Sequence, residues 1–407
     1  MSLVVRGDVF DGEEPLGLGA VVIDQAAGTI TEAGKDGDAD VPKGAKVIGG
    51  EGFTVLPGLI DAHVHFFGSK FYDLGAWVSV PEPMVALRSV PQLTDILAAG
   101  FTAVREMGSK GGALIAKAVR EGSIDGPTVL SCGRSLGQTG GDDDPTNLPL
   151  DVAQRLSYSY FGDGPWEMRR AVRQVLRDGA DFIKVYAATG STVEPFDSPF
   201  FHLRPQLTVE ELKAIVDEAH RVGIRVAAHA IGEESMASVI EAGVDSIEHG
   251  VALTPELAAH IKKKGIYYVP TLGVFITNPT LNGMINDPAA PDPVLARRHV
   301  KADMKLAKEA GLDVVCGTDF GGTDQQPHGK NQVEIAALAE TLGNKEALVS
   351  ATSRAARCLG MERSGRIKRG FTADLVLVRG NPLDDIQVLQ TEGIAAVVKG
   401  GRLFRGG

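Results

Sequence analysis

The chain has 407 residues, of which 43% are hydrophobic and 23% are charged, a composition that favours one large buried core with a smaller second unit. Its net charge is −11, from 41 basic and 52 acidic residues, and no Lys/Arg-rich tract interrupts this balance. These features argue against a nucleic-acid partner and against an anionic membrane surface. The three cysteines form no CxxC or CxxH pattern, and neither a signal-peptide pattern nor a run of 18 apolar residues is present. We therefore expect a soluble, cytoplasmic protein.

The first predicted elements are short strands near both ends of the chain. Each is an apolar or alternating run bounded by Gly- and Asp-bearing turns. They are Met1–Val5, Ala20–Asp24, Lys46–Ile48, Asp374–Val378 and Ala395–Lys399. Strands this short do not form a stable sheet alone. We therefore predict that residues 1–56 and 361–407 pair into one small β-domain.

Between these ends, residues 57–360 alternate between strand and helix patterns, as in an α/β protein. The eight strand candidates are Val55–His63, Phe101–Arg105, Thr128–Cys132, Phe182–Tyr186, Ile224–His229, Ser246–Glu248, Ile266–Pro270 and Leu312–Cys316. Helix candidates lie near residues 91–99, 111–121, 166–178, 209–222, 233–242, 255–263, 293–310 and 331–341. Eight strands, each followed by a helix, predict a (β/α)8 TIM barrel. An open doubly wound sheet has the same periodicity and is the alternative.

Two helix starts carry capping signals. Thr208 is followed three residues later by Glu211, the pattern of a capping box. Thr254 precedes Pro255, which is an N-cap residue followed by proline at the first helical position. We predict that helices begin directly after Thr208 and Thr254.

Two connections in the central region are too long to be simple turns. Gly133–Pro165 contains an Asp- and Gly-rich stretch, and Thr271–Pro293 is rich in Asn, Pro and Gly. Loops of this length in a compact domain are usually lids or binding loops. We expect both to border the functional site.

The first barrel strand ends on two histidines. His63 and His65 are two residues apart on an extended segment, so their imidazoles point to the same face. That geometry lets both bind one metal ion, at about 2.0–2.1 Å. A lone His-x-His is weak evidence, but the apolar run at 55–61 makes two surface histidines implausible. We predict a metal site here.

Lys184 lies in a strand candidate that is too apolar for a comfortable ammonium group. One interpretation is a salt-bridged lysine, or one that extends its charge out at the strand end. The other is a lysine held neutral by desolvation and neighbouring cations, which reacts with carbon dioxide to form a carbamate that bridges two metal ions. The ligand-type histidines elsewhere in the chain favour the second interpretation.

Three more residues of ligand type end strand candidates. His229 and His249 end consecutive strands, which a barrel would place side by side. Asp319 follows Gly317-Thr318 at the end of the eighth strand, where an acidic residue could simply cap the next helix. Beside the histidines, we expect Asp319 to bind a metal ion and to accept a proton from bound water.

The remaining histidines divide into two groups. His220, His260 and His299 fall on helix candidates with charged neighbours, and we expect them at the surface. His202 and His328 fall in loops after the fourth and eighth strands, on the face where the site is predicted. Either of these two can contact a substrate.

Taken together, these motifs resemble the amidohydrolase superfamily of the binuclear-metal type. The motifs are Pro57–His65, Lys184, His229, Glu248-His249-Gly250 and Gly317-Thr318-Asp319. Runs at 100–105, 133–141 and 370–375 are similar to the subgroup of imidazolonepropionase-like proteins and Xaa-Pro dipeptidases (prolidases). The resemblance covers nearly the whole chain, and it implies a (β/α)8 barrel with a β-sandwich built from both termini.

The resemblance also implies a set of ligands for two divalent metal ions. His63, His65 and Asp319 would hold the first ion, His229 and His249 the second, and a carbamate of Lys184 with carbon dioxide would bridge them. These ligand types suit zinc.

The chain departs from its prolidase-like relatives where they hold a substrate carboxylate. Asp142 stands where they usually have histidine, and Ile231 where they often have tyrosine. Neither residue would hold an anion, so a free carboxylate would need another group such as His202, His328 or Arg204. The substrate-binding candidates are Gln138, Asp142, Tyr186, His202, Ile231 and His328.

The implied activity is hydrolysis by a metal-bridging hydroxide, with Asp319 as proton acceptor and Lys184 as the bridging group. We expect a small amide substrate, such as a dipeptide or N-acyl amino acid. The alternatives are a urea, carbamate, cyclic-amide or lactone hydrolase with the same metals, or a non-catalytic binding protein that kept the scaffold. The partner is then a small molecule, and a homo-oligomer is compatible with this reading.

Overall fold

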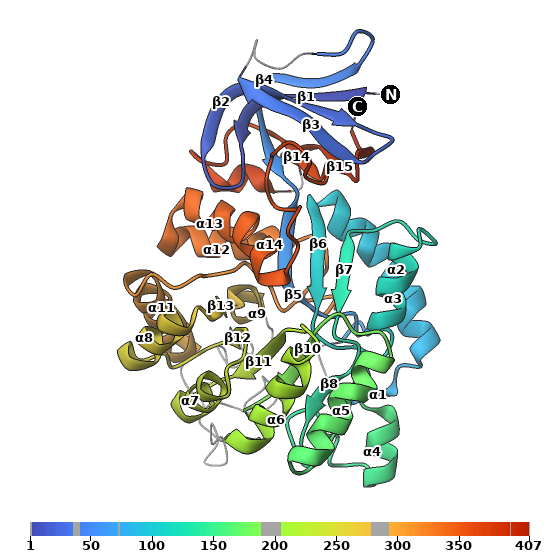
Figure 1. Cartoon of the computed structure of the whole chain (residues 1–407), viewed down its shortest axis with the longest axis vertical. Helices are drawn as coiled ribbons and strands as arrows, with labels where there is room; N and C mark the ends of the chain where they lie inside the picture. Colours follow the sequence, from blue (N-terminus) through green and yellow to red (C-terminus); the bar gives the residue numbers. More distant parts are fainter. Residues whose placement is uncertain are drawn as a thin grey trace.

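The computed structural model describes residues 2–35, 41–71, 74–188, 205–277, 293–390 and 392–406. Figure 1 shows a β-sheet at one end of the molecule, where both chain termini lie, and a larger part in which helices flank short strands. In the part of the chain that is described, no helix is both long enough and apolar enough to cross a membrane.

The sheet at the chain ends has seven strands in the order β16-β15-β14-β4-β1-β2-β3. Their bounds are β1 Ser2–Phe10, β2 Pro15–Asp24, β3 Thr29–Lys35, β4 Lys46–Pro57, β14 Leu375–Arg379, β15 Ile394–Lys399 and β16 Arg402–Arg405. Each of the five predicted runs corresponds to a strand. The strands β3 and β16 were not predicted because they lack an apolar pattern. One residue of β3 is buried, and no residue of β16 is.

Strand β4 joins the two ends of the chain. One edge of β4 pairs in parallel with β1, and the other pairs antiparallel with β14. Because β4 belongs to both halves, the strands form one continuous sheet rather than the two separate sheets expected of a β-sandwich. Side chains from both halves pack into one apolar cluster, which includes Val5, Val21, Ile48, Leu377 and Val398.

The larger part contains two parallel sheets. A three-stranded sheet has the order β5-β6-β7, and a six-stranded sheet has the order β13-β12-β11-β10-β8-β9. The bounds are β5 Leu59–Val64, β6 Phe101–Glu106, β7 Thr128–Ser131, β8 Ser135–Gly137, β9 Ser159–Phe161, β10 Ile183–Tyr186, β11 Val226–Ala230, β12 Ser246–His249 and β13 Tyr267–Val269. Seven of the eight strand candidates therefore correspond to strands, although the first spans the end of β4 and most of β5.

The eighth candidate, Leu312–Cys316, is not a regular strand. It makes an isolated bridge between Val314 and Tyr268, and Val315 donates its backbone N–H to the Tyr268 carbonyl. The prediction was wrong here because the backbone partners are divided: Cys316 donates to the Ser350 carbonyl instead of to a neighbouring strand. Within the described ranges, the two parallel sheets do not form a single closed sheet.

Single backbone hydrogen bonds nevertheless connect the two sheets. Asp181, before β10, donates to the carbonyl of Ser131 in β7 (2.7 Å). On the other side, Ala62 of β5 donates to the Cys316 carbonyl, and His65 donates to the Phe320 carbonyl, each at 2.8 Å. The segment 312–320 therefore lies between β13 and β5.

Helices follow most of these strands. Those that match the predictions are α2 Glu82–Ala98, α3 Gly112–Arg120, α5 Pro165–Arg177, α6 Val209–His220, α7 Glu233–Ala242, α8 Pro255–Lys264, α11 Pro293–Glu309 and α12 Gln332–Leu342. The unpredicted ones are short: α1 Leu74–Ser79, α4 Leu150–Leu156, α9 Leu272–Thr277, α13 Asn344–Ser350, α14 Ser353–Leu359 and the 3-10 helix η1 Ile386–Leu389. Both predicted caps are confirmed, since the side chains of Thr208 and Thr254 accept the N–H groups of Glu211 and Leu257.

The two long connections are partly structured. Gly133–Pro165, which we predicted as a long loop, contains β8, α4 and β9. The second connection begins with α9, and its residues 278–292 lie outside the described residues.

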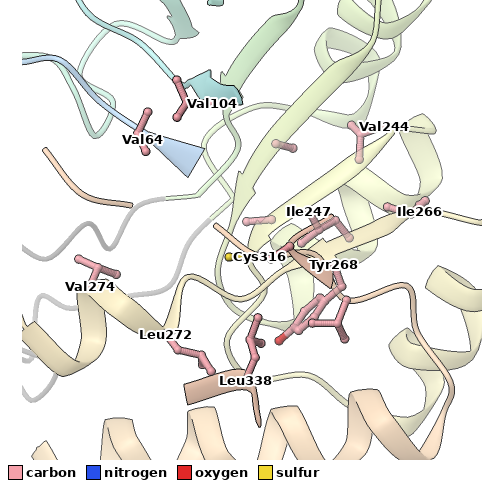
Figure 2. Close-up of a cluster of buried hydrophobic side chains, with 14 of the residues drawn as sticks. Val64, Val104, Val244, Ile247, Ile266, Tyr268, Leu272, Val274, Cys316 and Leu338 are labelled. Carbon is pink, nitrogen blue, oxygen red and sulfur yellow. The ribbon is translucent and has the colours of Figure 1, made fainter. Parts of the chain in front are cut away.

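The core of the larger part is mainly aliphatic. Strands β5, β6, β11 and β12 are buried along their whole length, as expected of parallel strands covered on both faces. Figure 2 shows side chains of this core, among them Val64, Val104, Ile247, Tyr268 and Leu338. This packing fixes the strands and therefore the side chains at their ends.

Candidate metal centre

The carboxyl ends of the strands bring the predicted ligands to one place. His63 lies in β5, His229 in β11 and His249 at the end of β12. The register pairs Ala230 with His249 and Tyr186 with His229, so the ends of β10, β11 and β12 are level. Side chains at this edge therefore face a common centre.

Three of these residues form a group that can hold one metal ion. Candidate ligand atoms of His63, His65 and Asp319 all lie within 4.8 Å of one another. Asp319 Oδ1 is 3.3 Å from His63 Nε2 and 3.2 Å from His65 Nε2. Two imidazoles and one carboxylate at this spacing are a common ligand set for divalent transition metals.

The other two histidines continue this group. The ring centroids of His63 and His249 are 5.2 Å apart, and those of His249 and His229 are 4.6 Å apart. The four imidazoles thus form a row in the order His65, His63, His249, His229.

Lys184 is buried beside this row. Its Nζ lies 5.0 Å from the ring centroid of Tyr186, whose ring is 5.2 Å from that of His229. Burial lowers the pKa of Lys184, while Glu248 and Asp319 oppose this shift. A lowered pKa increases the fraction of neutral amine, which is the form that can react with carbon dioxide.

The donor atoms fit a metal ion. Nε2 of His63 and Nε2 of His229 are buried without a hydrogen-bond partner among the described residues; the contact from His63 Nε2 to Asp319 lacks hydrogen-bond geometry. The Nδ1 atoms of His63, His65 and His249 are already occupied, by Glu248, the Gly108 carbonyl and Thr271 Oγ1 at 2.8–2.9 Å. Buried polar atoms rarely stay unpaired, so the free Nε2 atoms are suited to bind a cation.

The protonation states also suit metal binding. Burial lowers the pKa of His65, lowers that of His229 to about 3 and lowers that of His249 well below its ordinary value. Burial alone would raise the pKa of Asp319, but electrostatic attraction from His63 and the close contacts of the carboxylate with the His63 and His65 imidazoles hold it well below its usual range. At neutral pH the site therefore presents neutral imidazoles at His65, His229 and His249 and an ionised carboxylate at Asp319.

Glu248 and Arg105 orient His63 from behind. Glu248 Oε2 accepts from His63 Nδ1 (2.9 Å), and Glu248 Oε1 accepts from Arg105 (2.7 Å) and from Ser246 Oγ (2.5 Å). Burial opposes ionisation of Glu248, but Arg105 and His63 lower its pKa to about 2. Arg105 also donates to the Ala62 carbonyl (2.7 Å), next to His63 in the chain. Sequence reasoning had no role for Arg105.

Asp61 fixes the position of Asp319. Its carboxylate accepts from the backbone N–H groups of His63 and Thr318, from Thr318 Oγ1 and from Asn331 Nδ2, at 2.7–3.0 Å. These bonds tie β5 to the turn that carries Asp319, whose φ is +60°. A left-handed φ at a non-glycine residue is costly and is typical of functional sites. Asn331 was not among the site residues predicted from the sequence.

Glu106 supports His65 through one backbone unit. Its Oε1 accepts the N–H of Gly108, whose carbonyl accepts from His65 Nδ1. Burial raises the pKa of Glu106 to about 7, although Ser131 donates a hydrogen bond of 2.6 Å to Oε2.

The predicted substrate-binding residues are more scattered. Tyr186 contacts the site through Lys184 and His229. Gln138 and Asp142 lie in the turn region after β8, and Ile231 is buried directly after β11. His328 donates from Nε2 to the His65 carbonyl (3.0 Å), so it supports a predicted ligand. His202 and Arg204 lie outside the described residues.

Of the three histidines expected at the surface, two can be placed. His260 and His220 are both exposed, and His220 pairs with Asp245 at 2.8 Å. Nothing can be said of the side chain of His299, which lies outside the residues whose side chains are described.

Comparison with known proteins places this arrangement among hydrolases. The model of the amidohydrolase family matches residues 54–404. The chain is 33% identical to ochratoxinase from Aspergillus niger over 435 aligned positions, which cover 100% of this chain and 87% of the relative. The crystal structure of A. niger ochratoxinase superposes with a TM-score of 0.88 at 30% identity and covers 100% of this chain and 96% of the other. The crystal structure of a Xaa-Pro dipeptidase with bound methionine gives a TM-score of 0.84 at 32% identity, with both chains covered completely.

Proposed function

Because the chain belongs to the amidohydrolase family, and is therefore a hydrolase, we propose that it cleaves a small amide C–N bond with the help of two divalent metal ions. The substrate type we propose is a dipeptide or an N-acyl amino acid, in line with the names of two similar proteins, an ochratoxinase and a Xaa-Pro dipeptidase. The observation that carries the proposal is the convergence of four imidazoles, Lys184 and Asp319, with two buried Nε2 atoms left unpaired.

In this proposal, His63, His65 and Asp319 would hold the first ion, and His229 and His249 would hold the second. A carbamate on Lys184 would be a ligand of both. Zinc is the expected metal because imidazole and carboxylate ligands suit it. When bound, such ions polarise a substrate carbonyl and lower the pKa of water from 15.7 towards about 7.

The chain's own groups supply the proton transfer. Asp319 is ionised at neutral pH and lies within 3.3 Å of two imidazoles, so it is placed to accept a proton from the attacking water. The same carboxyl can return that proton to the leaving amine, which must be protonated before it departs. Asp61 and Glu248 hold Asp319 and His63 in place for this transfer.

We also propose that the parallel strands form a closed (β/α)8 barrel. The support is a continuous path of hydrogen bonds: β5, β6 and β7 lead through Asp181 to β10, and β13 leads through segment 312–320 back to β5. A closed barrel would explain why ligands from both ends of the chain's central region meet at one edge.

Metal analysis and a substrate panel test the proposal together. We expect about two divalent ions per chain, and we expect Lys184→Ala to lose most bound metal and at least about 100-fold in kcat/KM because it removes the bridging group. Lys213→Ala is the control, since Lys213 is an exposed lysine paired with Glu241.

The panel should contain dipeptides and N-acyl amino acids next to ureas, carbamates, cyclic amides and lactones. Turnover of the amides supports the proposal. Turnover restricted to the other classes would replace the amide assignment, and no turnover of any class by fully metal-loaded protein would favour a binding protein.

A further inference from the structure

Four aromatic side chains form a separate cluster next to the metal centre. Phe67, Trp77, Tyr158 and Tyr186 pack together, and we call them the aromatic wall. They come from four segments: the residues after β5, helix α1, the residue before β9 and the end of β10. The main core beside them is mostly aliphatic. Four rings delivered to one place by four elements are therefore a specific feature of this site.

The aromatic wall touches predicted ligands at both ends of the histidine row. The Phe67 ring stacks on the His65 imidazole, with centroids 4.6 Å apart and planes 12° apart. Tyr186 lies 5.2 Å from His229 and beneath Lys184. Trp77 stacks on Phe67 at 3.9 Å, and Tyr158 packs against Phe67 at 5.4 Å. A substrate whose carbonyl reaches the centre would therefore meet these rings within a few bonds.

The four residues of the aromatic wall are buried but not completely sealed. Their relative exposures are 6% for Phe67, 8% for Trp77, 5% for Tyr158 and 7% for Tyr186. In the main core, Phe66 and Phe101 are 0% exposed and Tyr268 is 1% exposed, whereas Phe275 is 7% exposed. Complete burial is thus attainable in this fold, and the four rings beside the metal centre do not reach it.

The aromatic wall is also uncharged. The indole N–H of Trp77 donates to the Phe71 carbonyl (2.9 Å), so the indole has little polarity left to offer. Neutral rings favour flat apolar groups, by offset stacking or edge-to-face contact.

We propose that the aromatic wall binds an aromatic or bulky apolar group next to the scissile amide, and that Trp77 and Tyr158 are specificity-determining residues. This inference rests on the proposed amide hydrolysis and names its substrate class. The amide would then carry a ring on the acyl carbon or on the amino-acid side chain adjacent to the cleaved bond.

Matched substrate pairs test this preference. N-acetyl-L-phenylalanine is compared with N-acetyl-L-alanine, and N-benzoylglycine with N-acetylglycine, so that a ring is added on either side of the amide. We expect the aromatic member of at least one pair to have a kcat/KM at least about 10-fold higher. Trp77→Leu and Tyr158→Leu should reduce that ratio about 10-fold, mainly through KM, at unchanged metal content.

The chain supplies a matched control and a second readout. It has two tryptophans, and Trp166 is 83% exposed at the start of α5. Trp166→Leu should leave the substrate ratios unchanged. In the Trp166→Phe variant, Trp77 is the single tryptophan, and its emission should change saturably with 3-phenylpropionate but not with propionate. In the Trp77→Phe variant, neither compound should change the emission of Trp166.

The outcomes separate this inference from the proposed function. Two results would overturn the proposed role of the aromatic wall, even if alanine-type amides are cleaved. One is a kcat/KM ratio near one for both substrate pairs, and the other is a Trp77 emission that does not respond to 3-phenylpropionate. A saturable Trp77 response without hydrolysis of any amide would support the aromatic wall and reject the proposed function.

Discussion

Glu248 holds a predicted ligand of the candidate metal centre in position, although it is not itself a predicted ligand. It is fully buried, and its two oxygens are divided between His63 and Arg105. A carboxylate behind a ligand histidine fixes the tautomer and the ring orientation. It also compensates the buried guanidinium of Arg105, so its charge has two functions.

Glu248→Gln should therefore weaken metal binding by about 10- to 100-fold, because His63 loses its charged acceptor. Metal titration against a competing chelator measures this change. The double variant Glu248→Gln/Arg105→Gln removes both buried charges, and it separates the orientation of His63 from the cost of an unpaired arginine. Glu241→Gln, at an exposed carboxylate paired with Lys213, is the control. Metal affinity unchanged in both Glu248 variants would rule out the orienting role.

Glu106 predicts a pH dependence of stability. Burial raises its pKa from 4.5 to about 7, so between these values the folded protein keeps a proton that the unfolded chain has released. The contribution of Glu106 is therefore complete below about pH 4.5 and is lost as the pH rises towards 7, by up to about 3 kcal/mol. Urea unfolding of metal-free protein at pH 5 and pH 7.5 measures the loss. In Glu106→Gln, the free energy of unfolding should fall less between pH 5 and pH 7.5. An equal fall in both proteins would contradict the assignment of this pH dependence to Glu106.

The residues that sequence reasoning found and missed differ in one physical respect. Each predicted ligand is a polar residue in or just after an apolar strand run, so its placement is visible locally. Arg105 and Asn331 act through partners 143 and 270 residues away, Glu248 and Asp61. No local pattern contains such pairs, and only the folded chain brings them together.

At the scale of single elements, helix α6 starts next to the site and depends on its cap. Thr208 accepts the N–H of Glu211, and the Glu211 side chain accepts the N–H of Thr208 (2.8 Å). The Glu211 carboxylate also accepts from Gly164, before α5, so the cap links two helices.

Thr208→Ala should lower the free energy of unfolding by about 1 kcal/mol, because the first turn of α6 loses an acceptor. Urea unfolding monitored by circular dichroism measures it, and Thr208→Ser should retain most of the stability because serine keeps the hydroxyl. Metal content should not change, since no predicted ligand lies in α6. A Thr208→Ala protein as stable as the parent would show that the capping box does not contribute to the free energy of unfolding.

Element prediction succeeded where the pattern was long and failed where it was short. Helices of ten or more residues and strands in continuous apolar runs were found. The strands β8 and β9 have three residues each and lie in no continuous apolar run. The strand β13 also has three residues, but it lies in the run Ile266–Pro270 and was predicted. The run Leu312–Cys316 has the composition of a strand, but its backbone hydrogen bonds are divided among Tyr268 in β13, Ala62 in β5 and Ser350 in α13. In such a case, composition predicts that the run is buried, but it does not predict the backbone hydrogen bonds to a neighbouring strand.

At the scale of the whole molecule, the candidate metal centre joins segments from residue 63 to residue 319. In the unfolded chain these side chains are dispersed, so a metal ion that needs all of them binds the native state alone. Binding restricted to the native state stabilises it by RT ln(1 + [L]/Kd), about 4 kcal/mol at 1,000 times Kd. The apparent stability of the fold should therefore depend on metal concentration.

Thermal unfolding should show this linkage directly. Protein treated with a chelator and then supplied with zinc should unfold about 5 °C or more above the metal-free protein, with Tm rising further as free zinc increases. His229→Ala removes a ligand whose Nε2 is unpaired without metal, so its metal-free form should lose little stability while its zinc-dependent shift becomes smaller. A Tm that is independent of zinc in the parent chain would mean that the four imidazoles, the lysine and the aspartate do not bind as one site. The Nε2 atoms of His63 and His229 would then need another partner, because buried donors and acceptors are seldom left unpaired.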